Sequence, residues 1–533
     1  MAQTLYPELS VQEKNIVGYK HIEDRLTPEL IFAFVEPIGG GAELAINALK
    51  FELQKEKFNY KINYISVSDV ITKEAEKNNF KLGELSEKVA TIKGLSGEAR
   101  RVNTLQLAGS YLRKKFKNDF LAKKVMQKIS EYRVENNGIT MVEGSIARAE
   151  PLRVVHIIKS LKNKSEYDLL KAVYGNMFFL IAVSGSFSQQ KKNYSSRHAG
   201  MHLHQNIDEE FIALSAIDQD EGVDNGQQVR DVFYKADIFL NNNTQDIQEE
   251  LSRFLGLLFG QIISSPTFYE TMMFEAFASS LKSCCLSRQV GAAIASDAKE
   301  LISTGWNDVP AYDGGLATDS NPIAKQTLCK EIGGCNSNEN INKLLIRVFR
   351  ALEGEGLLAS FSAENIEKHA PKLTKSMGLS ELIEFSRAIH AEMEAILSAA
   401  RTAKQGLIGG TIFVTTYPCD NCVKHILAAG LHRVVYIEPY PKSRAKAFFP
   451  ECVVDENSGE ETANRLVFTQ FTGISPQAYI GLFKCNSSRK NKQTGVYTPC
   501  GDAAMPITNV FLDSFTLYEA QIVKKIEEEV KSD

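Results

Sequence analysis

One histidine, one glutamate and two cysteines at fixed spacing constrain this chain more than any other feature of its sequence. His390 and Glu392 stand two residues apart, and the later stretch Pro418-Cys-Asp-Asn-Cys422 supplies Cys419 and Cys422. Zinc takes nitrogen and sulfur ligands in a tetrahedron, and a catalytic zinc site combines three protein ligands with a water. The pattern therefore predicts a Zn²⁺ site formed by His390, Cys419 and Cys422, with Glu392 left free to move protons.

The same pattern indicates a reaction. Zinc lowers the pKa of a bound water from about 15.7 to about 7, so that this water can attack an amidine-like ring carbon such as C4 of cytosine. Glu392 would then deliver protons to the departing ammonia, as in zinc-dependent deaminases with H-x-E followed by P-C-x-x-C. Taken alone, C-x-x-C is also compatible with a redox pair or half of a structural zinc knuckle.

The residues around these side chains predict a helix, a strand and a second helix. Ile389–Ala400 contains strong helix formers without glycine or proline, so we expect a helix whose first turn carries the histidine and the glutamate. Thr411–Thr415 predicts a short strand, and Pro418 suits the start of a helix over Asp420–Ala429. Both cysteines then lie near a helix N-terminus, where the helix dipole favours a thiolate.

The length and composition predict two soluble domains. A chain of 533 residues is too long for one ordinary core, and 44% hydrophobic with 24% charged residues is typical of globular proteins. No apolar run of about 18 residues predicts a membrane span, and the N-terminus does not resemble a secretory signal. Nine cysteines in so long a chain indicate reduced thiols and metal ligands, and hence the cytoplasm. A pI near 6.2 argues against a broad nucleic-acid-binding surface.

The first half predicts a degenerate P-loop, kinase-like domain. An apolar strand at Leu30–Val35 runs into a turn with Gly39, Gly40 and Gly41, and a helical pattern follows. A working P-loop places lysine and Ser/Thr after the last glycine, but Ala42-Glu43 stand there. The turn either binds a nucleotide through its three glycines or is purely structural.

Further strands complete the predicted fold class, which is α/β with a parallel sheet in the first half. Val154–Ile158 and Phe178–Val183 read as buried strands joined by a crossover helix. We expect a kinase-like regulatory domain over residues 1–250 and the zinc-dependent domain over 251–533. The second domain contains an insertion at about 311–382, an irregular stretch through Lys492 and a charged helical tail.

The second half resembles a known family. His390-Ala-Glu392-Met, Pro418-Cys-Asp-Asn-Cys422, Arg288-Gln-Val-Gly-Ala and Gly305-Trp-Asn307 resemble the deoxycytidylate deaminase branch of the cytidine deaminase superfamily. The fusion to a degenerate P-loop domain is similar to bacterial anti-phage dCTP/dCMP deaminases. The resemblance implies an α/β/α deaminase domain with a mixed five-stranded sheet. It also implies conversion of dCTP and dCMP to dUTP and dUMP, dCTP depletion during phage infection, an inhibitory small noncoding RNA and a homo-oligomer.

The resemblance also assigns substrate-binding roles. Asn307 would bind the sugar or phosphate, Arg288, Lys442 and Arg444 would hold phosphate, and Tyr417 would stack on the pyrimidine. The alternatives are ordinary surface cations and an aromatic side chain that packs beside the site.

Two further points follow from the resemblance. Deoxycytidylate deaminases commonly read H-A-E-x-N, but Glu394 stands in the place of that asparagine. It would contact the sugar 3′-hydroxyl, or a shifted triphosphate with Mg²⁺ between them. Cys329 and Cys335 are similar to ligands of a second, structural zinc in some relatives, and the alternative is two buried free thiols.

Two other functions remain open from the sequence. A tRNA or single-stranded DNA base deaminase shares the zinc motif, but it needs a basic channel. A non-catalytic regulator with a structural zinc has no use for Glu392. The expected ligands are deoxycytidine nucleotides and an allosteric nucleotide. We expect no association with a membrane.

Overall fold

The structure is a computed structural model. It describes residues 25–80, 97–142, 145–196, 207–242, 247–357, 365, 368–369, 373–374, 377, 379, 382–402, 406–438, 444–484, 490–497 and 505–532. Part of the predicted insertion at 311–382 and Lys442 lie outside these residues. None of the described helices is both long enough and apolar enough to cross a membrane.

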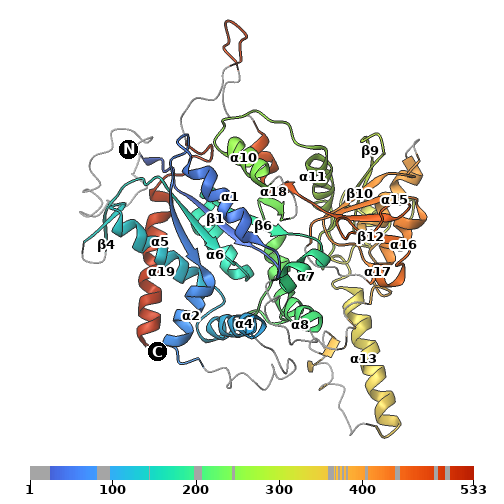
Figure 1. The fold of residues 1–533 in the computed structure, drawn as a ribbon. Helices are drawn as coiled ribbons and strands as arrows, with labels where there is room; N and C mark the ends of the chain where they lie inside the picture. The colour runs from blue at the N-terminus through green and yellow to red at the C-terminus, as the bar shows by residue number, and fades with distance from the viewer. Residues whose placement is uncertain are drawn as a thin grey trace, which may run out of the picture. The chain divides into compact units, whose positions relative to one another are not determined.

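The contacts divide the chain into two compact units (Figure 1). Unit 1 comprises Met1–Glu270, Glu438–Tyr440 and Gln470–Asp533. Unit 2 comprises Thr271–Ile437 and Pro441–Thr469. The second unit is thus inserted into the sequence of the first.

The sheet of unit 1 has the strand order β14-β7-β6-β1-β5-β2. All neighbours from β7 to β2 are parallel, and only β14 is antiparallel to its neighbour. The central strands β1 (Leu30–Val35) and β6 (Phe178–Ser184) are buried at every residue, because helices cover both faces of the sheet. The predicted strands of the first half are confirmed. The other strands of unit 1 are β2 (Lys61–Ser66), β3 (Ile139–Val142), β4 (Ser145–Ala149), β5 (Val154–Lys159), β7 (Ile238–Asn241) and β14 (Gly473–Ile474).

Alternation along β5 shows how the two faces of this sheet are covered. Val155 and Ile157 point into the main core, which they share with α1 (Ala42–Gln54) and α10 (Ile247–Leu258). His156 points to the other face, towards α5 (Phe120–Glu135). The other helices of unit 1 are α2 (Val67–Lys77), α4 (Gly97–Lys115), α6 (Lys164–Tyr174), the 3₁₀ turn Gly175–Met177, α7 (Phe187–Ser196), α8 (Ile207–Gln219), α9 (Val229–Phe233), α18 (Pro476–Phe483) and α19 (Asp513–Ser532).

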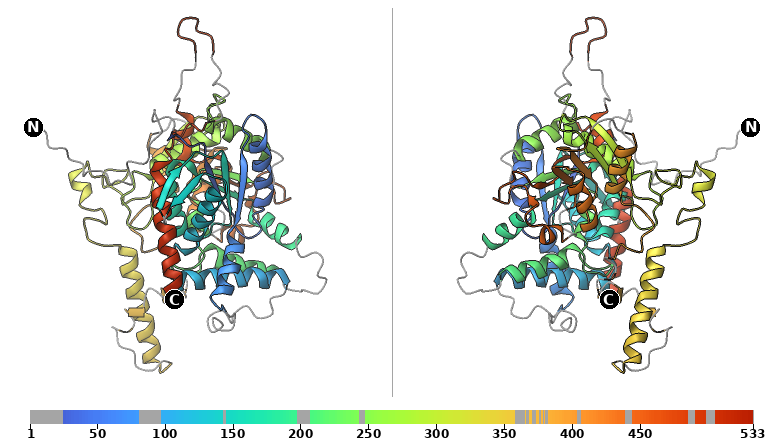
Figure 2. Two further views of the ribbon diagram at one scale, coloured as in Figure 1. Left: turned by 90° about the vertical axis from the view of Figure 1, so that its left-hand side faces the viewer. Right: turned by 90° about the vertical axis from the view of Figure 1, so that its right-hand side faces the viewer.

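The C-terminal segment completes unit 1. β14 adds an edge strand beside β7, and α18 places Ala478 and Leu482 in the main core. α19, drawn in red, lies along α5 (Figures 1 and 2). The predicted division assigned residues 470–533 to the second domain. The observed division differs because the pairing and apolar partners of this segment all belong to unit 1.

A buried ionic cluster fixes α19 to α5. Arg133 is fully buried, and its guanidinium donates to Glu29 at 2.8 Å and to Glu519 at 2.5 Å. Tyr174 also donates to Glu519, at 2.5 Å. Burial raises the pKa of the Glu29 carboxyl, but Arg133 and His156 lower it by more, so the pKa ends below its ordinary value.

The sheet of unit 2 has the order β12-β13-β11-β10-β8-β9 among the described residues. β8 is antiparallel to β9 and β10, whereas β10 and β11 are parallel. β8 and β9 form a hairpin, and the sheet has one strand more than the predicted five. The strands are β8 (Gly291–Ala295), β9 (Leu301–Trp306), β10 (Thr411–Val414), β11 (Arg433–Tyr436), β12 (Val453–Asp455) and β13 (Leu466–Gln470).

The helices of this part of the chain are α11 (Phe268–Ser280), α12 (Pro322–Lys325), α13 (Asn336–Gly354), α15 (Ala391–Thr402), α16 (Asp420–Ala428) and α17 (Ala445–Phe448). α15 packs on β8 and β9. A Cβ at Gly305 would lie 2.3 Å from Ala395 N and 2.4 Å from Ala391 O, so the close packing of β9 on α15 requires glycine there. The prediction of an irregular stretch through Lys492 was wrong, because it contains the short elements β12, β13, β14, α17 and α18.

Candidate active site

Two helix N-termini bring the predicted zinc ligands together. His390 directly precedes α15, and its carbonyl accepts a hydrogen bond from Glu394 N at 2.9 Å. Cys419 is the N-cap of α16, and Cys422 lies in the first turn of that helix. His390 therefore stands one position before the helix whose first turn was predicted to carry it, whereas Glu392 lies within that turn.

The spacing of the three side chains fits a zinc ion. His390 Nδ1 lies 3.4 Å from Cys419 Sγ and 3.3 Å from Cys422 Sγ, and all three ligand atoms lie within 4.8 Å of one another. A tetrahedral zinc with Zn–N of about 2.0 Å and Zn–S of about 2.3 Å sets nitrogen and sulfur about 3.5 Å apart. No other group of three potential metal ligands meets this spacing in the part of the chain that the structure describes.

The charge of the site also suits a cation. Glu392 is 3% exposed, and burial raises the pKa of its carboxyl while the neighbouring His390 lowers it by less. The hydrogen bond between the two thiols lowers the pKa of Cys419 to about 4 and raises the pKa of Cys422, so that the pair shares one negative charge. A thiolate and a carboxyl thus lie together in a largely buried place, which favours a bound positive ion.

Asp308 holds in place the residue that precedes His390, and the sequence did not predict this role. Its backbone forms an isolated bridge with Ile389, and its carbonyl accepts from Ile389 N at 2.9 Å. The buried carboxylate accepts from Cys284 N at 2.7 Å and Val309 N at 2.9 Å. Its place directly after Gly305-Trp-Asn307 was the signal that could have identified it.

Asn307 holds the segment before β8 in place. Its side-chain oxygen accepts from Val290 N at 2.7 Å, and its amide nitrogen donates to the carbonyl of Arg288 at 2.8 Å. Asn307 is 8% exposed, so a contact with a substrate would use the remaining amide hydrogen or the second lone pair of the side-chain oxygen. Arg288 itself is exposed.

Tyr417 lies in the core of unit 2. It is 7% exposed, and its ring centroid lies 4.7 Å from that of Tyr436 and 5.3 Å from that of Phe468. This placement favours the packing role over stacking on a pyrimidine. Arg444 is exposed at the N-cap of α17, with its guanidinium carbon 5.2 Å from the ring centroid of Phe448.

Glu394 is buried in α15 rather than exposed. Its side chain is 5% exposed, and one of its oxygens lies 2.5 Å from Arg401 Nη2, which is 7 residues further along the same helix. The other oxygen is buried without a hydrogen-bond partner among the described residues. Arg401, which the sequence interpretation also missed, thus compensates the charge that replaces the family's asparagine.

The second predicted metal site has weaker support. Cys335 is the N-cap of α13, and its sulfur lies 3.9 Å from Ser287 Oγ. Burial raises the pKa of the Cys329 thiol, and the nearby Cys285 and Cys335 add to this rise. Within the described residues, these thiols belong to no three-ligand group.

The glycine-rich turn of unit 1 is held by side chains of its own domain. Gly39 and Gly41 have φ of +77° and +80°, which favours glycine. Asn193 donates to the Gly39 carbonyl at 3.0 Å, and Asn242 donates to that of Gly40 at 2.6 Å. The binding of a nucleotide by Gly39, Gly40 and Gly41 therefore stays a prediction.

Comparisons with known proteins point to one family. Residues 266–438 match the family described as the cytidine and deoxycytidylate deaminase zinc-binding region. The deoxycytidylate deaminase of Enterobacteria phage T2 is 30% identical over 187 residues, which are 33% of this chain and 81% of that protein.

Two solved structures are also similar. The dCMP deaminase of cyanophage S-TIM5 in complex with dCMP and dUMP is 17% identical and covers 39% of this chain and 99% of its own, with a TM-score of 0.21. The shikimate kinase from Acinetobacter baumannii in complex with shikimate is 12% identical and covers 44% of this chain and 93% of its own, with a TM-score of 0.21.

Proposed function

The chain belongs to the cytidine and deoxycytidylate deaminase family, and from this membership we propose that it removes the 4-amino group of deoxycytidine nucleotides. The protein is a hydrolytic deaminase, and the family match lies largely in unit 2. The observation that carries the proposal is the convergence of His390, Cys419 and Cys422 within 4.8 Å beside the buried Glu392.

The roles of the four side chains follow from their chemistry. A zinc ion held by His390, Cys419 and Cys422 would lower the pKa of a water to about 7. Glu392 accepts a proton from the attacking water and passes it to N3 of the cytosine ring. It then takes the proton of the new hydroxyl group on C4 and gives it to the 4-amino group, which leaves as ammonia, so that C4 becomes the carbonyl of uracil. Burial of Glu392 keeps bulk water from competing for these protons.

We propose dCMP and dCTP as substrates, converted to dUMP and dUTP. The phage T2 relative is named for dCMP, which supports the monophosphate. The other proposals rest on the sequence resemblance. They are the triphosphate with Mg²⁺ as a substrate, a role in phage defence by dCTP depletion, regulation by unit 1 and an allosteric nucleotide, an inhibitory small RNA and a homo-oligomer. Asn307, Arg288, Arg444 and Lys442 remain the proposed contacts to sugar and phosphate.

The test uses the purified full chain with dCMP, dCTP, CTP and a cytosine-containing single-stranded DNA. Released ammonia and uracil products are measured for each, alongside a Glu392→Ala variant whose zinc content is determined. We expect turnover of dCMP or dCTP that disappears in the variant while zinc remains bound.

The other outcomes assign the protein differently. Turnover of the DNA strand alone would place it with base-editing deaminases. No turnover of any substrate by the zinc-loaded chain, with or without added deoxynucleotides, would contradict the proposal and favour a regulatory protein.

A further inference from the structure

We propose that unit 1 carries a binding site for a nucleoside, recognised by its base rather than by phosphate. The site is a cavity of about 290 Å³ at the carboxyl ends of β1, β2 and β5, where Glu36, Ser66 and Lys159 lie. Ligands of parallel α/β sheets bind at this end of the strands. We also propose that a nucleoside bound in the cavity regulates deamination. This regulation rests on the proposed function, whereas the binding of the nucleoside does not depend on it.

The phosphate-binding position of the glycine turn is already filled. In the P-loop pattern G-x-x-x-x-G-K-[ST], the first glycine falls five residues before Gly41, where this chain has Glu36. The Glu36 carboxylate accepts from Ala42 N at 2.7 Å, at the N-terminus of α1. This amide is one that a bound phosphate would use, so an internal carboxylate takes the place of a phosphate group.

The lysine and arginine side chains that line the cavity are also already paired, so they are not available to bind a phosphate. Four of them line it, and each is paired with a carboxylate: Arg101 with Glu98, Lys159 with Glu43, Lys162 with Asp218 and Arg113 with Glu166. A triphosphate would have to break several of these pairs. The cavity therefore suits a ligand without a large negative charge.

The floor of the cavity consists of buried hydrogen-bonding groups. Gln106, Arg113 and Gln227 line it and are 5%, 2% and 3% exposed. Gln106 Nε2 donates to the Leu214 carbonyl at 3.2 Å, while its Oε1 is buried with no partner among the described residues. This amide oxygen lacks a donor, and a rotation of the Gln106 side chain would present it to the N–H or amino group of a nucleobase in the cavity.

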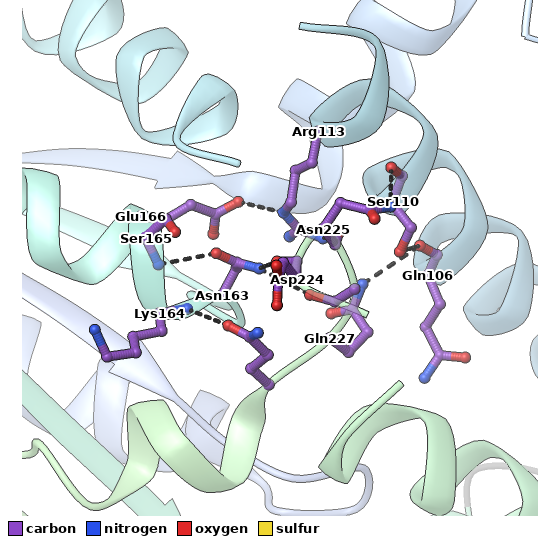
Figure 3. Close-up of polar contacts among 12 residues, drawn as sticks. Gln106, Ser110, Arg113, Asn163, Lys164, Ser165, Glu166, Asp224, Asn225 and Gln227 are labelled. Carbon is purple, nitrogen blue, oxygen red and sulfur yellow. Dashed lines mark hydrogen bonds and ion pairs between the residues drawn. The ribbon is translucent and has the colours of Figure 1, made fainter. Parts of the chain in front are cut away.

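A polar network holds this floor rigid (Figure 3). Arg113 lies between Glu166, at 2.7 Å, and the carbonyl of Asn225, at 3.4 Å. Asn163 donates to the carbonyl of Gly226 at 2.9 Å, and Gln227 donates to the carbonyl of Gln106 at 3.3 Å. The ion pair between Arg113 and Glu166 is fully buried, and such a pair is stable only when its geometry is well fixed. The side chain of Arg113 is therefore held in one position at the cavity.

The walls of the cavity suit a flat heterocycle. Apolar side chains from three elements line it, among them Ile38, Val67 and Leu105, together with the ring of Tyr64. Small-molecule sites combine such apolar walls with a few fixed polar groups, and their volumes begin at about 300 Å³. A single nucleoside fits this size and this chemistry, whereas a dinucleotide is too large.

Isothermal titration calorimetry on the Glu392→Ala variant of the 533-residue chain tests the proposal without turnover. The probes are deoxycytidine, deoxyuridine, thymidine, deoxyadenosine and deoxyguanosine, each compared with its 5′-triphosphate. We expect at least one nucleoside to bind with one site per chain and its triphosphate to bind more weakly. Leu105→Trp fills the cavity and should abolish this binding. Gln106→Leu should weaken it about tenfold, as expected for one buried hydrogen bond.

A matched control separates a filled cavity from a damaged fold. Ile212→Trp adds the same side chain at a position of α8 that is 55% exposed and does not line the cavity, and it should leave binding unchanged. Binding that survives Leu105→Trp would belong to another site, such as the deaminase site, and would overturn the proposal. So would the absence of binding by all five nucleosides, or triphosphates that bind more tightly than nucleosides. Failure of the ammonia assay with binding that Leu105→Trp abolishes would contradict only the deaminase function.

Discussion

Glu392 lies in the first turn of α15, buried beside three metal-binding side chains, and it is not needed as a ligand. Its function and the function of the ligands are therefore separable by substitution. His390 is one residue outside the same helix, and both cysteines belong to the start of α16. Short-range backbone geometry thus places the residues of each half of the site, and the packing of α15 against α16 brings the two halves together.

The Glu392→Gln variant should keep its zinc and lose its activity. Glutamine has nearly the same shape, but it cannot carry the proton, so kcat should fall by about 10²–10⁴-fold. Steady-state ammonia release and metal analysis check this. Glu461→Gln, at an exposed position of the same unit, is the control and should keep full activity. Loss of zinc from Glu392→Gln would contradict the assigned role.

The Cys422→Ser variant should lose zinc and, with it, activity. A serine hydroxyl is a poor zinc ligand, and two remaining ligands do not hold a structural or catalytic zinc. Metal analysis of the purified chain is the measurement. Cys452→Ser, which removes a thiol outside the cluster, should retain one zinc per chain. Equal zinc content in both variants would place the metal elsewhere.

The ligand set could be predicted from the sequence because each pair of residues is local to one helix start. The side chains around the substrate could not. The ring of Tyr417 points into the core because Tyr436 and Phe468 lie there, and only the folded sheet brings these three together. Asn307 was found by its motif, but its bonds to the backbone at 288 and 290 depend on how β9 ends beside β8.

α19 is joined to the rest of unit 1 by charge as well as by apolar packing. Glu519 from this helix and Glu29 from the start of β1 share the guanidinium of Arg133, which is 0% exposed. Breaking one side of such a buried pair leaves an uncompensated charge. Glu519 therefore links the helix to unit 1, together with buried apolar residues such as Phe515 and Ile526.

The Glu519→Gln variant should lower the free energy of unfolding of unit 1 by about 3 kcal/mol, because Arg133 keeps only one carboxylate. Chemical denaturation of the full chain measures this. Glu528→Gln changes an exposed residue of the same helix and should cost less than about 0.5 kcal/mol. Equal effects of the two substitutions would show that the buried pair does not stabilise the helix.

Element prediction succeeded where apolar patterns are long and failed where elements are short. β1, β5 and β6 are nearly continuous apolar runs, and they were found with almost their observed bounds. β14 has two residues and exists because β7 offers it a free edge. Such pairing between distant segments leaves no local pattern, so the destination of the C-terminal segment was not visible in the sequence.

At the scale of the whole molecule, one unit of the chain is interrupted by the other. A chain that ends at residue 469 would lack β14, α18 and α19, and with them Ile474, Ala478 and Leu482, so the core residues that these side chains cover would be exposed. We expect unit 1 of this shortened chain to unfold at a markedly lower temperature or to aggregate, while zinc content reports on unit 2. Unchanged thermal unfolding would show that the C-terminal segment does not stabilise unit 1.

The same interruption sets an order of events during synthesis. Unit 1 begins the chain, but its edge strand and last helices leave the ribosome only after the roughly 200 residues between Glu270 and Gln470. At about 5–20 residues per second, the nascent sheet waits roughly 10–40 s with β7 uncovered. The metal-binding segment is synthesised within this interval, so premature termination soon after Gln470 would release chains that contain the zinc ligands but whose first unit is unfinished.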